Sequence, residues 1–91
     1  MIYLTISRRN NKERDLLYSF IQKHYSKTKE KIIVRRGHKN ITDMIKDAHK
    51  KGAKNIIIAG MQNDRSISVR RLLLVGDGDY LWKTDIPQKV I

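Results

Sequence analysis

The sequence contains no cysteine, and this absence excludes disulfide bonds, thiolate zinc sites and cysteine nucleophiles. No apolar run approaches the roughly 20 residues that a membrane-spanning helix requires. No basic segment precedes an apolar one at the N-terminus, so we expect no signal peptide and a cytoplasmic location. Acidic residues are also scarce, because 9 Asp and Glu stand against 20 Lys and Arg in a chain of 91 residues. This length predicts a single domain over residues 1–91.

The excess positive charge is concentrated in the first part of the chain. Residues 1–55 hold fifteen Lys and Arg against five Asp and Glu, whereas residues 56–91 hold five against four. Such asymmetry indicates a polyanionic partner, with nucleic acid as the first interpretation and an anionic membrane as the second. A domain that is merely basic throughout remains the alternative.

Hydrophobic patterning predicts an α/β fold in the order β-α-β-α-β-β-β. Helical crossovers that join parallel strands are right-handed, so the two helices should cover a parallel three-strand core. The last two strands should form an antiparallel hairpin on the resulting mixed sheet. We expect helices at residues 12–25 and 41–51, and strands at 2–6, 32–34, 53–60, 69–75 and 80–84, with Pro87 ending the last strand.

No constellation of residues predicts catalysis, a metal or a cofactor. His24, His38 and His49 are scattered and lack the spacing of metal ligands. Of the three, only His38 falls in a loop where it could contact a phosphate or a base. Gly-Asp-Gly-Asp at 76–79 is too acidic to cradle a nucleotide and is typical of a hairpin turn. We therefore expect a protein that is not an enzyme.

Basic clusters follow each of the first three predicted strands. In an open parallel sheet, ligands bind outside the C-terminal ends of the strands, where such loops meet. Seven of the eight side chains are arginines, whose planar guanidinium suits bidentate phosphate contacts and stacking on bases. The alternative is that each cluster only keeps one sheet end solvated. The candidate RNA-binding residues are Arg8, Arg9, Arg35, Arg36, Lys39, Arg65, Arg70 and Arg71.

Three segments of the chain together resemble the first half of a Brix domain, a module of ribosome-biogenesis factors in archaea and eukaryotes. The matching segments are Thr-Ile-Ser-Arg-Arg at 5–9, Val-Arg-Arg-Gly-His-Lys-Asn-Ile at 34–41, and Gly-Ala-Lys-Asn-Ile-Ile-Ile-Ala-Gly at 52–60. Each segment is short, but their order and spacing also fit. The similarity covers roughly residues 3–75 and looks closest to the archaeal versions.

The resemblance implies a fold similar to the anticodon-binding domains of class II aminoacyl-tRNA synthetases. It also implies binding to rRNA or pre-rRNA, and contacts with ribosome-assembly proteins, during subunit assembly and rRNA processing. A Brix domain contains two such halves, whereas this chain supplies one. The missing half is therefore expected from a second copy, as a homodimer, or from another protein, and the third alternative is that this chain has no partner half.

Two other functions remain open at this stage. The first is a free-standing tRNA-binding domain, which would share the fold and the charge. The second is a protein-interaction subunit whose basic face meets an acidic partner. For self-association, the alternative to a dimer is a monomer in which Trp82 folds back over the core.

Overall fold

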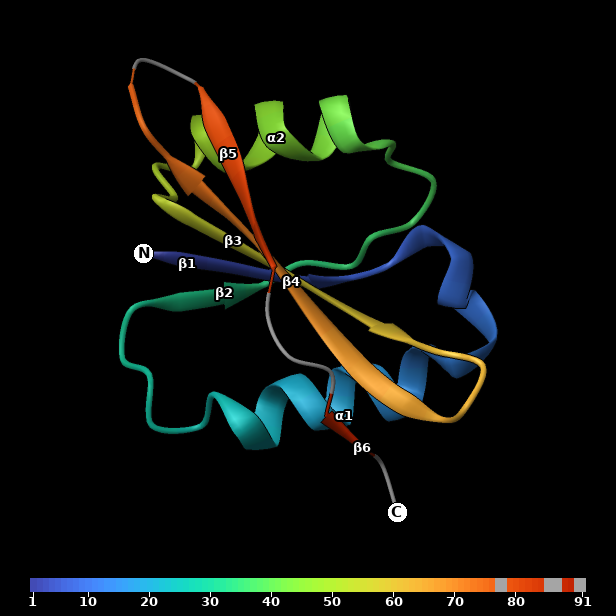
Figure 1. The fold of residues 1–91 in the computed structure, drawn as a ribbon. Helices are drawn as coiled ribbons and strands as arrows, with labels where there is room; N and C mark the ends of the chain where they lie inside the picture. The colour runs from blue at the N-terminus through green and yellow to red at the C-terminus, as the bar shows by residue number, and fades with distance from the viewer. Residues whose placement is uncertain (77–78, 85–87, 90–91) are drawn as a thin grey trace.

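The computed structural model describes residues 1–76, 79–84 and 88–89, which form one mixed sheet flanked by helices (Figure 1). The strands lie in the order β2-β1-β3-β4-β5, and the two-residue strand β6 (Gln88–Lys89) also pairs with β4. Strands β2, β1 and β3 are parallel, whereas β4 and β5 are antiparallel to their neighbours. The predicted α/β class and the parallel three-strand core are confirmed.

The first crossover runs from β1 (Ile2–Ile6) through a 3-10 segment, η1 (Arg8–Glu13), and helix α1 (Arg14–His24) to β2 (Lys31–Ile33). Leu17 and Ile21 of α1 are buried against one face of the sheet, where they meet Leu4 and Ile57. The helix expected at 12–25 is confirmed over Arg14–His24. However, the residues before it form the separate segment η1, and Glu13 occupies the helix N-cap without a side-chain cap bond.

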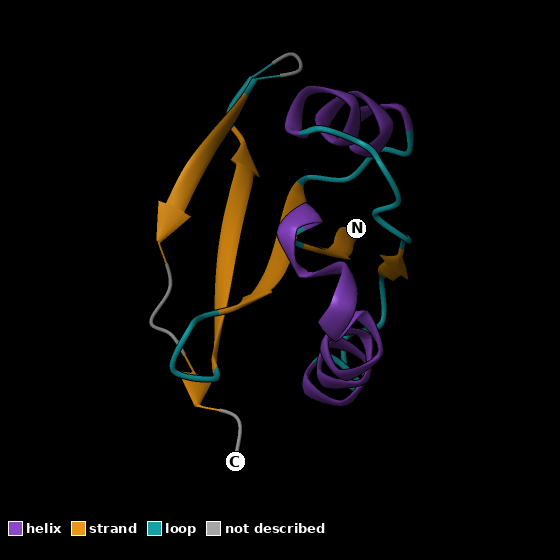
Figure 2. Cartoon of the chain, turned by 90° about the vertical axis from the view of Figure 1, so that its right-hand side faces the viewer, coloured by secondary structure: helices purple, strands orange, loops and turns teal. Residues whose placement is uncertain are grey.

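The second crossover runs through α2 (Ile41–Lys50) to β3 (Asn55–Met61) on the other side of β1. Met44 and Ala48 of α2 pack against Tyr3 and Ile56 on the opposite face from α1. Figure 2 shows the two helices on either side of the parallel strands. Residues 56–59 are all buried, as expected for a continuous apolar run in a sheet covered on both faces.

A hydrogen-bonded group ties α2 to the sheet. The Tyr3 hydroxyl donates to Asp47 at 2.7 Å, and the Lys51 ammonium lies 2.6 Å from the same carboxylate. The Lys51 and Tyr3 hydrogen bonds hold the pKa of Asp47 below its usual value. Tyr80 adds a similar link, because its hydroxyl donates to the Ala53 carbonyl at 2.7 Å.

The antiparallel part of the sheet is longer than predicted. Strand β4 (Ser66–Leu74) begins three residues before its expected start, so the loop after β3 reduces to a tight turn. In that turn Arg65 adopts a positive φ of 66°. Strand β5 (Tyr80–Thr84) pairs with β4, which confirms the expected hairpin. Residues 77–78 of its turn, and Pro87, lie outside the described residues.

Candidate functional site

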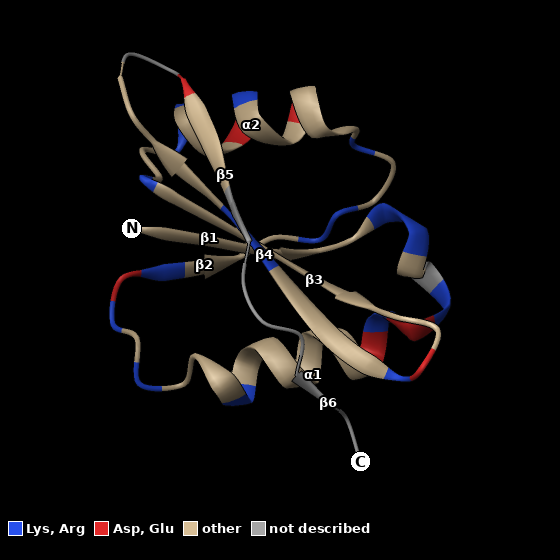
Figure 3. Cartoon of the chain, viewed as in Figure 1, with Lys and Arg blue, Asp and Glu red and all other residues tan. Residues whose placement is uncertain are grey.

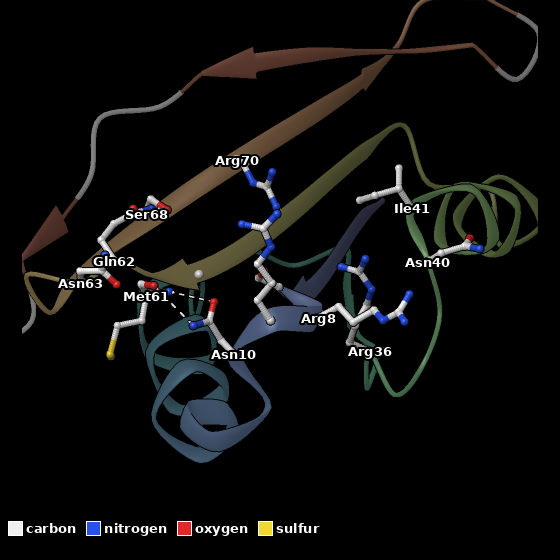
Figure 4. A pocket seen from close by; sticks show the side chains of 13 residues that line it. Arg8, Asn10, Arg36, Asn40, Ile41, Met61, Gln62, Asn63, Ser68 and Arg70 are labelled. Carbon is white, nitrogen blue, oxygen red and sulfur yellow. Dashed lines mark hydrogen bonds between the residues drawn. The ribbon is translucent and has the colours of Figure 1, made fainter.

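An open hollow of about 1000 Å³ lies at the C-terminal ends of the parallel strands (Figure 4). Its walls come from η1, from the segment before α2 and from the first turn of α2, while β3 and β4 form its floor. Four arginines line it, and we call it the arginine hollow after Arg8, Arg9, Arg36 and Arg70. The hollow therefore lies where ligands bind in open parallel sheets, outside the C-terminal ends of the strands.

The wall formed by η1 is held in place by Asn10. Strand β3 runs two residues past the end of β1, which leaves backbone groups near Met61 without a strand partner on that side. The Asn10 side-chain oxygen accepts a hydrogen bond from the Met61 amide at 3.2 Å. The Asn10 side-chain nitrogen donates to the Met61 carbonyl at 3.4 Å. Arg8 and Arg9, both exposed, are thereby positioned over the end of the sheet.

Gly60 allows this close approach of η1. A Cβ atom added at Gly60 would lie 3.2 Å from the Asn10 side-chain oxygen and 3.3 Å from Cβ of Ser7. Both distances are tighter than ordinary van der Waals contact. A larger residue would therefore push η1, and with it the two exposed arginines, away from the floor of the hollow.

Arg36 forms the buried back wall. Only 4% of its surface is exposed, and its guanidinium donates to the Lys39 carbonyl at 2.8 Å and to the Ile6 carbonyl at 3.0 Å. Its backbone amide donates to the Tyr18 hydroxyl at 2.8 Å. Burial first, and then the nearby Arg70, lower the pKa of Arg36 from its ordinary value. Arg36 therefore satisfies the backbone carbonyl at the end of β1 and also places positive charge at the hollow.

Helix α2 begins at the rim of the hollow. Asn40 is its N-cap, and the Asn40 side chain accepts a hydrogen bond from the Asp43 amide at 2.8 Å. Asn40 and Ile41 both line the hollow (Figure 4). The positive end of the helix dipole therefore adds to the potential of the arginines and favours an anion.

Strand alternation sends the two adjacent arginines of β4 to opposite faces. Arg70 pairs with Ile58, which packs in the cluster under α2, so Arg70 faces the hollow. Arg71 pairs with Ile57, which packs in the cluster under α1. Arg70 is exposed, and its guanidinium carbon lies 5.2 Å from the centre of the Trp82 ring.

The described residues that line the hollow carry positive charge without an acidic partner among them. Among the residues that the structure describes, no Asp or Glu lines it, and none of its four arginines forms an ion pair. Figure 3 shows basic segments of η1, the loop before α2 and the middle of β4 meeting in this region. Like charges held together without counter-charges attract anions strongly, and guanidinium groups suit phosphate oxygens best.

The structure does not gather all eight predicted residues at one place. Arg35 is exposed and lines a second, smaller hollow with His38, while Lys39 donates from its ammonium to the Arg35 carbonyl at 3.2 Å. Arg65 lies in the β3–β4 turn, and neither Arg65 nor Arg71 lines the arginine hollow. Sequence reasoning missed the contributions of Asn10, Asn40 and Ser68. Short polar residues at loop and strand ends carry no distinctive sequence signal for such a site.

The described part of the chain meets neither the requirements of a metal site nor those of a membrane-spanning helix. No cluster of three or more His, Cys, Asp or Glu side chains that could hold a metal occurs within the described residues. His24 stacks on Phe20 with ring centres 5.2 Å apart on α1, and His49 is exposed on α2. None of the described helices is long and apolar enough to cross a membrane.

The fold and the site together define an α/β domain with an open, arginine-lined crevice at the C-terminal ends of its parallel strands. A solved protein has the same fold: the crystal structure of a probable ribosomal biogenesis protein from Aeropyrum pernix K1, with a TM-score of 0.65 and 20% sequence identity. The match covers 99% of this chain and 44% of that one, so the chain spans less than half the length of that protein. No family model and no curated protein matches the sequence.

Proposed function

We propose that this chain binds RNA through the arginine hollow and acts on rRNA or pre-rRNA during ribosomal subunit assembly. The observation that carries the proposal is the convergence of four arginines on one open crevice that no carboxylate lines among the described residues. A polyanion with regularly spaced phosphates satisfies several guanidinium groups at once, which an isolated anion does not.

The choice of ribosomal RNA is supported by the shared fold with a probable ribosomal biogenesis protein. The Brix-like segments at 5–9, 34–41 and 52–60 lend further support, because the first two of them contribute three walls of the hollow. In this proposal the chain acts in the cytoplasm, as a Brix-type half-domain that works with other assembly factors and is not an enzyme.

The proposal is tested by the salt dependence of RNA binding. A labelled stem–loop from rRNA is titrated with wild-type protein and with Arg8→Ala and Arg70→Ala variants, between about 50 and 200 mM salt. Each variant should lose about 1–3 kcal/mol of binding free energy, and its salt slope should fall by about one. Lys50→Ala removes the same charge from the exposed last turn of α2 and serves as the matched control.

Two outcomes would contradict the proposal. Equal losses for Lys50→Ala and Arg70→Ala would show that only the total charge matters. Retention of an acidic protein in preference to RNA, with binding that does not weaken as salt rises, would favour a protein-interaction subunit. Competition with tRNA in the same assay distinguishes an rRNA-binding protein from a tRNA-binding domain of the same fold.

A further inference from the structure

Trp82 is the only tryptophan of the chain, and it lies on β5 with 49% of its surface exposed. Its cross-strand partner is Leu72, which packs in the cluster under α2, so Trp82 lies on the same side of the sheet as the arginine hollow. Trp82 is therefore about half exposed on this face of the sheet.

Arg70 connects this tryptophan to the hollow. Its guanidinium lines the hollow, and the guanidinium carbon is 5.2 Å from the indole centre, within the range of a cation–π contact. Ser68, Arg70 and Leu72 alternate along the same face of β4. The hollow and the indole thus form one continuous surface, with the charged part on β4 and the aromatic part on β5.

The other five aromatic side chains are placed differently. Tyr3 is buried, and the hydroxyls of Tyr18 and Tyr80 make hydrogen bonds to backbone atoms. Phe20 and Tyr25 pack on the α1 side of the sheet. Trp82 is consequently the aromatic side chain that stands beside the phosphate-binding groups with a large exposed surface.

We infer that Trp82 stacks on an unpaired base whose flanking phosphates are bound in the arginine hollow, so that the site selects single-stranded over double-stranded RNA. This inference rests on the proposed function, since the arginines must first bind the RNA backbone. In a duplex the bases already stack on one another and their faces are closed to a protein side chain. An unpaired base offers its face, and one stacking contact changes affinity by about five- to hundredfold.

The test uses the indole itself as the reporter, because no second tryptophan contributes to the emission. The full chain is titrated with a single-stranded oligouridylate, with a duplex RNA of equal phosphate content and with inorganic polyphosphate, which has no bases. We expect all three to bind through the arginines. Only the single strand should quench the tryptophan fluorescence strongly, and it should bind more tightly than the duplex.

Variants on β5 separate stacking from folding. Trp82→Leu should lose about five- to hundredfold in affinity for the single strand and leave duplex affinity unchanged. Trp82→Phe keeps an aromatic face and should retain most of the single-strand affinity. Leu81→Ala is the matched control, because Leu81 is adjacent and 60% exposed but points to the other face of the strand.

The outcomes distinguish the stacking role of Trp82 from the proposed RNA binding on which it rests. Binding of all three polyanions without quenching, and with equal affinities for single strand and duplex, would overturn the stacking role and leave the arginine hollow intact. No binding to any of the three would overturn the proposed function itself. Quenching in the wild-type protein is decisive even if a Trp82 variant fails to fold.

Discussion

Arg36 differs from the other arginines of the hollow because its side chain is buried and donates to two backbone carbonyls. Sequence position alone groups it with Arg35, yet the two neighbours point to different hollows. Replacement of Arg36 is therefore expected to lower both stability and the proposed RNA affinity. For Arg70, which is exposed, the two properties are separable.

The buried position of Arg36 gives a prediction about stability. Arg36→Ala leaves the Ile6 and Lys39 carbonyls without their donor, so the free energy of unfolding should fall by about 2–4 kcal/mol. Urea unfolding followed by circular dichroism measures this loss. Arg8→Ala removes an exposed arginine from the same hollow and should change stability by about 0.5 kcal/mol or less. An Arg36→Ala variant as stable as the wild type would show that the two hydrogen bonds are not structural.

At the scale of elements, the parallel core is predictable because its residues must be apolar in order to be buried. Residues 56–59 are apolar throughout and are buried on both faces, and the apolar positions of α2 follow a helical period. Local patterning and tertiary burial agree in these segments, so the sequence specifies them well.

The segments that deviate from prediction are those in which tertiary contacts outweigh local pattern. Residues 8–13 carry charged and amide side chains without an apolar stripe, and as a 3-10 segment they make the Asn10–Met61 contact across the fold. Ile67 and Ser68 precede the expected start of the strand at residue 69 but extend β4 because Met61 and Gly60 of β3 pair with them. The site depends on both deviations, and so its full composition was not predictable from the sequence.

The contact between η1 and β3 gives a prediction about this element. Gly60→Ala places a methyl group against Asn10 and Ser7, so η1 must shift and the protein should lose about 1–3 kcal/mol of stability. RNA affinity should fall as well, because Arg8 and Arg9 move with η1. Gly76→Ala is the control, since an added Cβ at Gly76 meets nothing within 4 Å. Thermal unfolding and the RNA titration decide the matter, and equal behaviour of the two variants would contradict the role of Gly60.

At the scale of the whole molecule, the homodimer expected from the sequence stays a prediction. Strand β5 lies at the end of the strand order, and both Leu81 and Trp82 expose much of their surface there. Exposed strand edges of this kind recruit further strands, and a second copy is one source.

Self-association through this edge is testable by sedimentation at micromolar concentration and moderate salt. We expect a dimer for the wild type and a monomer for Leu81→Lys, because a charge on an edge strand opposes strand pairing. If Trp82 lies in the dimer contact, single-stranded RNA should shift the wild type toward the monomer. A wild-type monomer whose sedimentation is unaltered by Leu81→Lys would rule out the dimer.

The arginine hollow is assembled from segments that are far apart along the chain: 7–10, 36–41, 60–63 and 68–70. Each segment alone is only a basic or polar loop or strand end, and contacts between distant segments form late in folding because closing long loops costs entropy. During synthesis, the first arginines therefore emerge well before Arg70 completes the floor. Under the proposed function, tight RNA binding therefore requires the complete fold. An incompletely synthesised chain would bind RNA only weakly, and RNA affinity would report that folding is complete.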